Sequence, residues 1–261
     1  MLQNRAERVT LPLQLRRMMR PDPPQCHVVV PAYLEARLIA RTLRDVPSYV
    51  RNIIVVDDGS GDDTSQVVRH QGDPRVTLLR HATNAGVGAA IVSGYRALMR
   101  LGGSAQDAFA VMAGDGQMHP DDLWRVASPV MQGEADYVKG NRFADPTTAR
   151  AMPRARFLGG HTFSILTSLA VGRRVSDTQC GYTALSRRAA ERLDLDSLWP
   201  RYGYPNDMIA RVLESHLKLL EVPVRAVYRD ETSTLRLRHL PPIAGILCRA
   251  AMRRVLQAAH G

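Results

Sequence analysis

Two short acidic stretches have the residue types and the spacing to hold a cation or a phosphate group. In "VVDDGSGDDT", Asp57 and Asp58 directly follow an apolar run, and in "AGDGQMHP", Asp115 stands between two glycines with Gln117 two residues later. Mg2+ and Mn2+ prefer oxygen ligands and often use only one or two protein carboxylates, because substrate phosphates supply the other oxygens. Asp115 alone can therefore be enough for a metal site, although turn formation also accounts for an aspartate between glycines.

Spacing excludes two familiar binding loops. An EF-hand calcium loop that began at Asp57 would need a glutamate at its twelfth position, where the chain has Val68. The stretch "NAGVGAAIVSG" contains Gly86 and Gly88, but Ile91 takes the place of the third glycine of a dinucleotide fingerprint. This stretch also follows the third predicted strand rather than the first, so we expect no nicotinamide or flavin cofactor.

Buried parallel strands are predicted to position these acids. The apolar runs "HVVVP", "NIIVVDD", "RVTLLRH" and "AFAVMAG" alternate with segments that have apolar residues at helical spacing. Strands of this kind need both faces covered, which predicts a Rossmann-like α/β/α sandwich with a mostly parallel sheet. Ligands bind such sheets outside the carboxyl ends of the strands, and three of these four ends present carboxylates. The less regular second half is predicted to add a helix over residues 121–132, a strand over 135–143, a helix over 159–172 and a strand near 218–229.

Residues 241–261 are predicted to form a basic amphipathic helix. On this helix Ile243, Ile246, Leu247 and Ala250 lie on one side. Two interpretations remain open: the helix lies on an anionic membrane, where each basic contact contributes about 1 kcal/mol, or it packs its apolar side against the rest of the protein.

Composition restricts the class of partner. The chain has 261 residues, 45% of them apolar, and a formal net charge of +10, so we expect a single domain with anionic partners. Aromatic residues make up only 5% and the strand ends are acidic, which argues against nucleic acid. Cys26, Cys180 and Cys248 are odd in number and widely spaced, and neither a signal peptide nor an apolar run of membrane-spanning length occurs. We expect a cytoplasmic protein.

Six blocks in order resemble the family 2 glycosyltransferases with a GT-A fold. The blocks are "VVVPAYLE", "VVDDGSGDDT", "NAGVGAAIVSGYR", "AGDGQMHPDDL", "KGNRF" and "SDTQCGYTAL", and the resemblance extends from about His27 to Tyr228. Within this family, the sequence resembles polyprenyl-phosphate sugar synthases of the dolichyl-phosphate mannose synthase type. Composition predicts a basic arm over residues 1–26 and a basic tail or helix over 231–261, and the resemblance implies a GT-A domain over 27–230.

The resemblance also implies roles for individual residues. The positions that match the family's nucleotide-sugar pocket are Pro31, Tyr33, Glu35, Asp57, Asp58, Asn84, Gly88, Asp115 and Gly116. Asp115 and Gln117 match the metal-binding positions, which implies Mg2+ or Mn2+, and Arg142 matches a basic residue near the diphosphate. Three positions depart from the family pattern: Ala113 replaces the first acid of the D-x-D motif, Leu34 replaces an asparagine, and Val87 replaces a frequent lysine.

The implied reaction is the transfer of a sugar, with inversion, from a UDP- or GDP-sugar to a lipid-linked acceptor. The expected acceptor is a polyprenyl phosphate, at the cytoplasmic face of the plasma membrane. Transfer to a hydroxyl of a glycolipid or soluble molecule is the alternative, and it needs a general base such as Asp207. Asp207 is equally explained as a helix N-terminal charge, worth about 0.3–1 kcal/mol. A non-catalytic nucleotide-sugar binder is a more remote alternative, suggested by Ala113.

Overall fold

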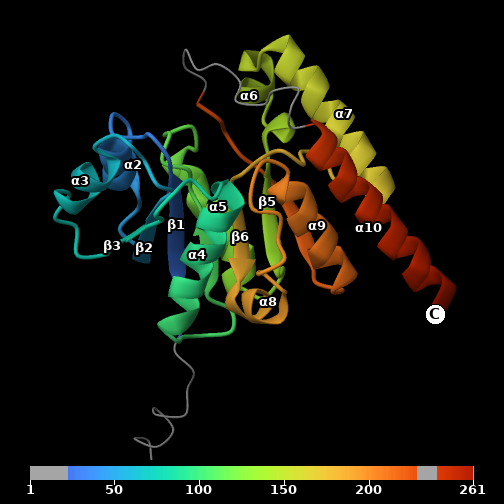
Figure 1. Cartoon of the computed structure of the whole chain (residues 1–261), viewed down its shortest axis with the longest axis horizontal. Helices are drawn as coiled ribbons and strands as arrows, with labels where there is room; N and C mark the ends of the chain where they lie inside the picture. Colours follow the sequence, from blue (N-terminus) through green and yellow to red (C-terminus); the bar gives the residue numbers. More distant parts are fainter. Residues whose placement is uncertain (1–22, 228–239, 261) are drawn as a thin grey trace, which may run out of the picture.

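The computed structural model describes residues 23–227 and 240–260, and Figure 1 shows a central sheet with helices on both sides. The strands are β1 (Cys26–Ala32), β2 (Val50–Asp57), β3 (Val76–Arg80), β4 (Ala108–Val111), β5 (Tyr137–Asn141), β6 (Thr183–Ser186) and β7 (Leu219–Pro223). They lie in the order β3-β2-β1-β4-β6-β5-β7. β6 is antiparallel to β4 and β5, whereas the other pairs are parallel. The predicted mostly parallel sheet is therefore confirmed.

Different helices cover the two faces of the sheet, because side chains alternate along each strand. The helices are α2 (Ile39–Asp45), α3 (Thr64–Arg69), α4 (Val87–Arg100), α5 (Leu123–Met131), α6 (Pro146–Ala151), α7 (Arg154–Val171), α8 (Arg187–Arg192), α9 (Tyr204–Glu214) and α10 (Leu240–His260), with the short 3-10 turns η1 (Pro120–Asp122) and η2 (Arg142–Ala144). Val28 and Val30 of β1 pack in one cluster with α2, α3 and α5. Val29 packs in the opposite cluster with α4, α8 and α9, so both faces are dry.

α10 packs against α7 and α9 at one end of the sheet (Figure 1). The predicted apolar side of α10 is buried there: Ile243, Ile246, Leu247 and Ala250 are each at most 9% exposed. The apolar side of α10 therefore packs against the rest of the protein, as one of the two interpretations predicted, and is not available to a membrane. None of the helices in the described part of the chain is long and apolar enough to cross a bilayer.

Parts of the predicted terminal segments cannot be compared with the structure. Residues 1–22 of the predicted basic arm, residues 228–239 and Gly261 lie outside the described residues. Within the described part, the chain enters the sheet at Cys26, one residue before the predicted start of the domain.

One strand was not predicted. β6 has only four residues, and the apolar Ala184 and Leu185 stand between polar neighbours. A run this short gives no periodic signal of its own. Its place in the sheet comes from pairing with two strands that precede it in the chain by more than 40 residues.

The closest approach of α4 to the sheet gives a stability prediction. A Cβ atom on Gly94 would lie 2.3 Å from Cγ1 of Val29, so Gly94→Ala should destabilise the protein by about 1–3 kcal/mol through overpacking. Gly159 of α7 has no atom within 4 Å of its Cβ position, so Gly159→Ala should stabilise by about 0.5–1 kcal/mol through helix propensity. Urea unfolding followed by circular dichroism measures both, and a Gly94→Ala variant as stable as the parent would contradict this packing.

Candidate active site

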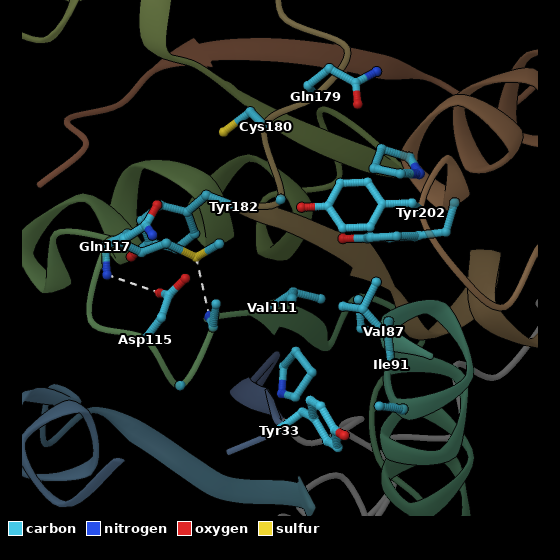
Figure 2. A pocket seen from close by; sticks show the side chains of 18 of the residues that line it. Tyr33, Val87, Ile91, Val111, Asp115, Gln117, Gln179, Cys180, Tyr182 and Tyr202 are labelled. Atoms are coloured by element: carbon cyan, nitrogen blue, oxygen red, sulfur yellow. Dashed lines mark hydrogen bonds between the residues drawn. The ribbon is translucent and has the colours of Figure 1, made fainter. Parts of the chain in front are cut away.

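A cavity of about 980 Å³ lies where the carboxyl ends of β1, β2, β4 and β5 meet. The predicted site residues that line it are Pro31, Tyr33, Glu35, Asp58, Asn84, Asp115, Gln117 and Arg142. In Figure 2, Asp115 and Gln117 lie on one side of the cavity, and Val87 and Ile91 of α4 lie across from them. The strand-end rule therefore predicted the place of the cavity, and the structure brings together residues up to 111 positions apart in the chain.

Asp115 lies in the turn that follows β4. Gly116 directly after it has a φ of +68°, a backbone conformation that glycine adopts at little cost. The turn lets the main-chain N–H of Gln117 donate to Oδ1 of Asp115 at 3.0 Å, which orients the carboxylate (Figure 2). Burial raises the pKa of Asp115 above its usual range, although the N–H of Gln117 and the charge of Arg156 oppose this rise.

The surroundings of Asp115 fit a divalent cation. No group of three or more His, Cys, Asp or Glu side chains could hold a metal ion among residues 23–227 and 240–260. What the site offers is one carboxylate whose charge is costly to bury and one neighbouring amide side chain, Gln117, facing a large cavity. This donor set suits Mg2+ or Mn2+, which keep several positions for water and substrate oxygens.

Asp58 fixes the loop after β3 against the end of β2. Its Oδ1 accepts the main-chain N–H of Ala85 at 2.9 Å, and its Oδ2 accepts that of Gly86 at 2.8 Å. Nδ1 of His81 lies 2.7 Å from the same Oδ1, and Nε2 of this ring lies 2.9 Å from Oγ of Ser93. Asp58 thus lines the cavity and also holds in place the loop that brings Asn84 to it.

Four predicted site residues lie outside the lining: Asp57, Gly88, Gly116 and Asp207. Asp57 is fully buried, where Oδ1 accepts the main-chain N–H of Ser60 at 2.9 Å and Oδ2 accepts the hydroxyl of Ser65. These bonds shape the turn after β2, so the structure does not support the predicted ligand contact of Asp57. Gly116 allows the turn beside Asp115 and does not face the cavity.

Gly88 and Asp207 both contact the segment before α9 instead. A Cβ atom on Gly88 would lie 2.4 Å from the carbonyl oxygen of Trp199, so the glycine allows a close approach between two backbones. Oδ2 of Asp207 accepts the main-chain N–H of Trp199 at 2.8 Å and pairs with Arg211 at 3.0 Å. Neither residue lines the cavity: Gly88 allows a contact with a segment far away in the chain, and Asp207 holds the loop that directly precedes its own helix.

Arg142 lines the cavity from η2 and is held by a buried carboxylate. Its Nε and Nη2 donate to Oδ2 and Oδ1 of Asp177 at 2.8 and 2.9 Å, a bidentate pair that fixes the plane of the guanidinium. Burial disfavours the ionised form of Asp177, but the charge and hydrogen bonds of Arg142, together with the charge of Lys139, lower the pKa of this carboxyl. Asp177 is completely buried beside Lys139 and Glu221, so water does not reach its carboxylate.

Three further arginines line the cavity and were not predicted: Arg156, Arg201 and Arg225. Nη1 of Arg201 donates to Oδ1 of Asn84 at 3.1 Å, and Nη2 of Arg225 donates to the buried Asp122 at 2.9 Å. Arg225 comes two residues after the end of β7, so the strand-end rule could have found it. Arg156 and Arg201 come from a helix and a loop, for which the sequence gives no such signal. With four arginines and three carboxylates, the lining suits a ligand that carries several negative charges.

Comparisons with known proteins agree with this geometry. A family model described as Glycosyl transferase family 2 matches residues 27–194. The UDP-N-acetylglucosamine–dolichyl-phosphate N-acetylglucosaminyltransferase of Methanococcus voltae is 28% identical over 219 residues, covering 78% of this chain and 86% of the relative. The polyprenol monophosphomannose synthase of Mycolicibacterium smegmatis is 29% identical over 211 residues, covering 78% of this chain and 77% of the relative.

A solved structure shares the fold. Glucosyl-3-phosphoglycerate synthase of Mycobacterium tuberculosis, in complex with Mn2+, UDP and phosphoglyceric acid, matches with a TM-score of 0.61 at 20% identity. The match covers 88% of this chain and 78% of that one. The similarity therefore shows that the two chains share a fold.

The buried charge of Asp115 predicts a stability change that depends on pH. Because the folded-state pKa of Asp115 is raised, ionising this carboxyl opposes folding, and Asp115→Asn should raise the Tm of the ligand-free protein near neutral pH. Below about pH 4, the ordinary value for aspartate, the carboxyl is protonated in both states and the difference should disappear. Melting curves across pH measure this, with Asp45→Asn at the exposed end of α2 as the control; a lower Tm for Asp115→Asn at neutral pH would contradict it.

Proposed function

The chain belongs to glycosyl transferase family 2, and we propose that it moves a sugar, with inversion, from a nucleoside-diphosphate sugar to a polyprenyl phosphate. It is a glycosyltransferase with the GT-A fold. The observation that carries the proposal is the cavity at the strand ends, in which Asp115 and four arginines face the same space. Dolichyl phosphate and polyprenol monophosphate in the names of two relatives support the choice of acceptor.

The donor binds between the end of β1 and the loop held by Asp58. Pro31, Tyr33 and Glu35 line this part of the cavity and receive the nucleoside, and the donor is a UDP- or GDP-sugar. Arg142 faces the diphosphate with a guanidinium that Asp177 holds in one plane. A fixed cation of this kind stabilises negative charge that develops on a leaving diphosphate without reorganising.

Asp115 and Gln117 hold a divalent cation, Mg2+ or Mn2+. The solved structure with the shared fold binds Mn2+ together with UDP, which supports this assignment. When bound, such a cation neutralises charge on the diphosphate of the donor. Because Ala113 leaves Asp115 as the single carboxylate of the D-x-D position, the cation binds weakly until the donor supplies phosphate oxygens.

A phosphate acceptor would react without a general base. A phosphate oxygen is already an anion and can attack the anomeric carbon directly, whereas a hydroxyl needs a base within hydrogen-bond reach. Asp207 was the predicted base for the hydroxyl alternative, and it lies outside the lining with Oδ2 bonded to Trp199 and Arg211. The geometry therefore favours a phosphate acceptor over a glycolipid or soluble hydroxyl.

The lipid-borne acceptor reaches the cavity from a membrane on which α7 lies, at the inner face of the plasma membrane. Leu158, Ile165 and Leu169 of α7 are 70%, 61% and 68% exposed, and the exposed Arg173 and Arg174 follow the helix. Exposed apolar side chains beside basic ones are typical of a surface that lies in the headgroup region of an anionic bilayer. Arg156 of the same helix lines the cavity, so α7 connects the proposed membrane surface with the site.

A transfer assay tests the acceptor. With UDP- and GDP-sugars and Mn2+, the protein should glycosylate a polyprenyl phosphate and leave the matching polyprenol unchanged, because only the phosphate can attack without a base. Thin-layer chromatography of labelled lipid measures both products, and omission of Mn2+ gives the metal dependence. Equal transfer to the polyprenol would contradict the phosphate acceptor and restore the hydroxyl alternative.

Binding to vesicles tests the membrane surface. The triple variant Leu158→Gln, Ile165→Gln, Leu169→Gln should lose about tenfold or more in affinity for vesicles rich in phosphatidylglycerol, since each buried leucine-sized side chain contributes about 1.5–3 kcal/mol. Leu101→Gln is the control, because Leu101 is 59% exposed at the end of α4. Co-sedimentation measures binding, and an equal loss in the control or no loss in the triple variant would contradict the assignment to α7.

A further inference from the structure

The segment that precedes α9, residues 194–203, forms one wall of the cavity. Trp199, Arg201 and Tyr202 from this segment line the cavity, and we name it the wall loop. Nε1 of Trp199 donates to the carbonyl oxygen of Tyr202 at 2.8 Å, so a hydrogen bond inside the wall loop stabilises its conformation. In Figure 2, Tyr202 faces the same space as Val87 and Ile91 of α4.

The wall loop lies directly on the N-terminus of α4. The main-chain N–H of Ala89 donates to the carbonyl oxygen of Pro200 at 3.1 Å. Cβ atoms on Gly86 and Gly88 would lie 2.4 Å from the carbonyl oxygens of Pro200 and Trp199, so only glycine permits this approach. Arg201 adds a bond from Nη2 to the carbonyl oxygen of Asn84 at 3.0 Å, besides its bond to the Asn84 side chain.

The other side of the wall loop is tied to α9 by one ion pair. Oδ2 of Asp207 accepts the main-chain N–H of Trp199 at 2.8 Å and Nε of Arg211 at 3.0 Å. The guanidinium of Arg211 donates to the carbonyl oxygens of Ser197 at 2.5 Å and Asp194 at 3.2 Å. Asp207 and Arg211 are nearly buried, with side chains 9% and 12% exposed, so the bonds of Asp207 to Arg211 and to Trp199 compete little with water, whereas the bonds of Arg211 to Ser197 and Asp194 lie at the surface.

We propose that Asp207 is a positioning residue which, together with Arg211, holds the wall loop in place beside the donor. The pair acts through the backbone of Trp199, Ser197 and Asp194, and Gly88 receives the loop on its other side. The inference rests on the proposed function for the identity of the ligand. It assigns to Asp207 a role in donor binding and none in proton transfer.

The kinetic test compares variants on both sides of the wall loop. Asp207→Asn, Arg211→Gln and Gly88→Ala should each raise the donor KM about tenfold, because each disturbs a contact that holds the wall loop beside the donor, and should change kcat much less. Arg211→Lys should recover part of the loss. The acid limb of the pH–rate profile should be the same in Asp207→Asn as in the parent. Asp45→Asn is the matched control, because Asp45 also pairs with an arginine four residues away but is exposed on α2.

A general base would give the opposite pattern. Asp207→Asn alone would then lower kcat by about a hundredfold or more and remove the acid limb, while Arg211→Gln and Gly88→Ala would not reproduce it. That result would overturn the proposal.

A second measurement reads the position of the wall loop without any turnover. The chain has two tryptophans, so in a Trp124→Phe background the emission comes from Trp199 alone. Acrylamide should quench Trp199 more strongly in Asp207→Asn, Arg211→Gln and Gly88→Ala than in the parent, and Asp45→Asn should have no effect. Unchanged quenching in all three variants would overturn the proposal. Absence of sugar transfer by the parent protein would instead count against the proposed function, since the quenching result does not depend on it.

Discussion

Burial of both faces of the sheet is the constraint on which the rest of the structure depends. Strands such as β1 and β4 are completely buried, so most of their side chains pack in the core and only the last residues, such as Pro31 and Val111, reach the cavity. Polar groups that must reach a ligand lie where the strands end, and parallel strands end at the same edge. The cavity, its carboxylates and Arg142 all lie at this edge.

Some side chains at this edge face the cavity, and others lie behind these and fix their orientation. Asp115, Arg142 and Arg225 face it, and Asp177 and Asp122 lie buried behind the two arginines. A guanidinium that is already paired loses little further freedom when a ligand binds. Asp58 combines both tasks, because one carboxylate lines the cavity and closes the loop that carries Asn84.

The sequence predicted what depends on local pattern and missed what depends on distant contacts. Asp58, Asp115 and Gln117 follow apolar runs, so their place at the sheet edge could be derived before the structure was known. The role of Gly88 depends on Trp199, which lies far away in the chain, and the role of Asp207 depends on the same residue in the irregular loop before α9; no periodicity predicts either contact. Position within a block was therefore a good guide to the region of a residue and a poor guide to whether it faces the ligand or supports a neighbour. β6 was missed for a related reason, since its pairing partners lie far away in the chain.

The buried charges behind Arg142 restrict how this chain can vary over time. Lys139 and Asp177 are completely buried, and Nζ of Lys139 donates to the carbonyl oxygen of Cys180 at 2.5 Å. Losing one member of such a group leaves an uncompensated charge in a place without water, whereas exchanging opposite charges together for apolar side chains can be nearly neutral. Homologous sequences that diverge from this chain should therefore replace Lys139 and Asp177 together or keep both. A single replacement at either position should be selected against, because it leaves an unpaired buried charge.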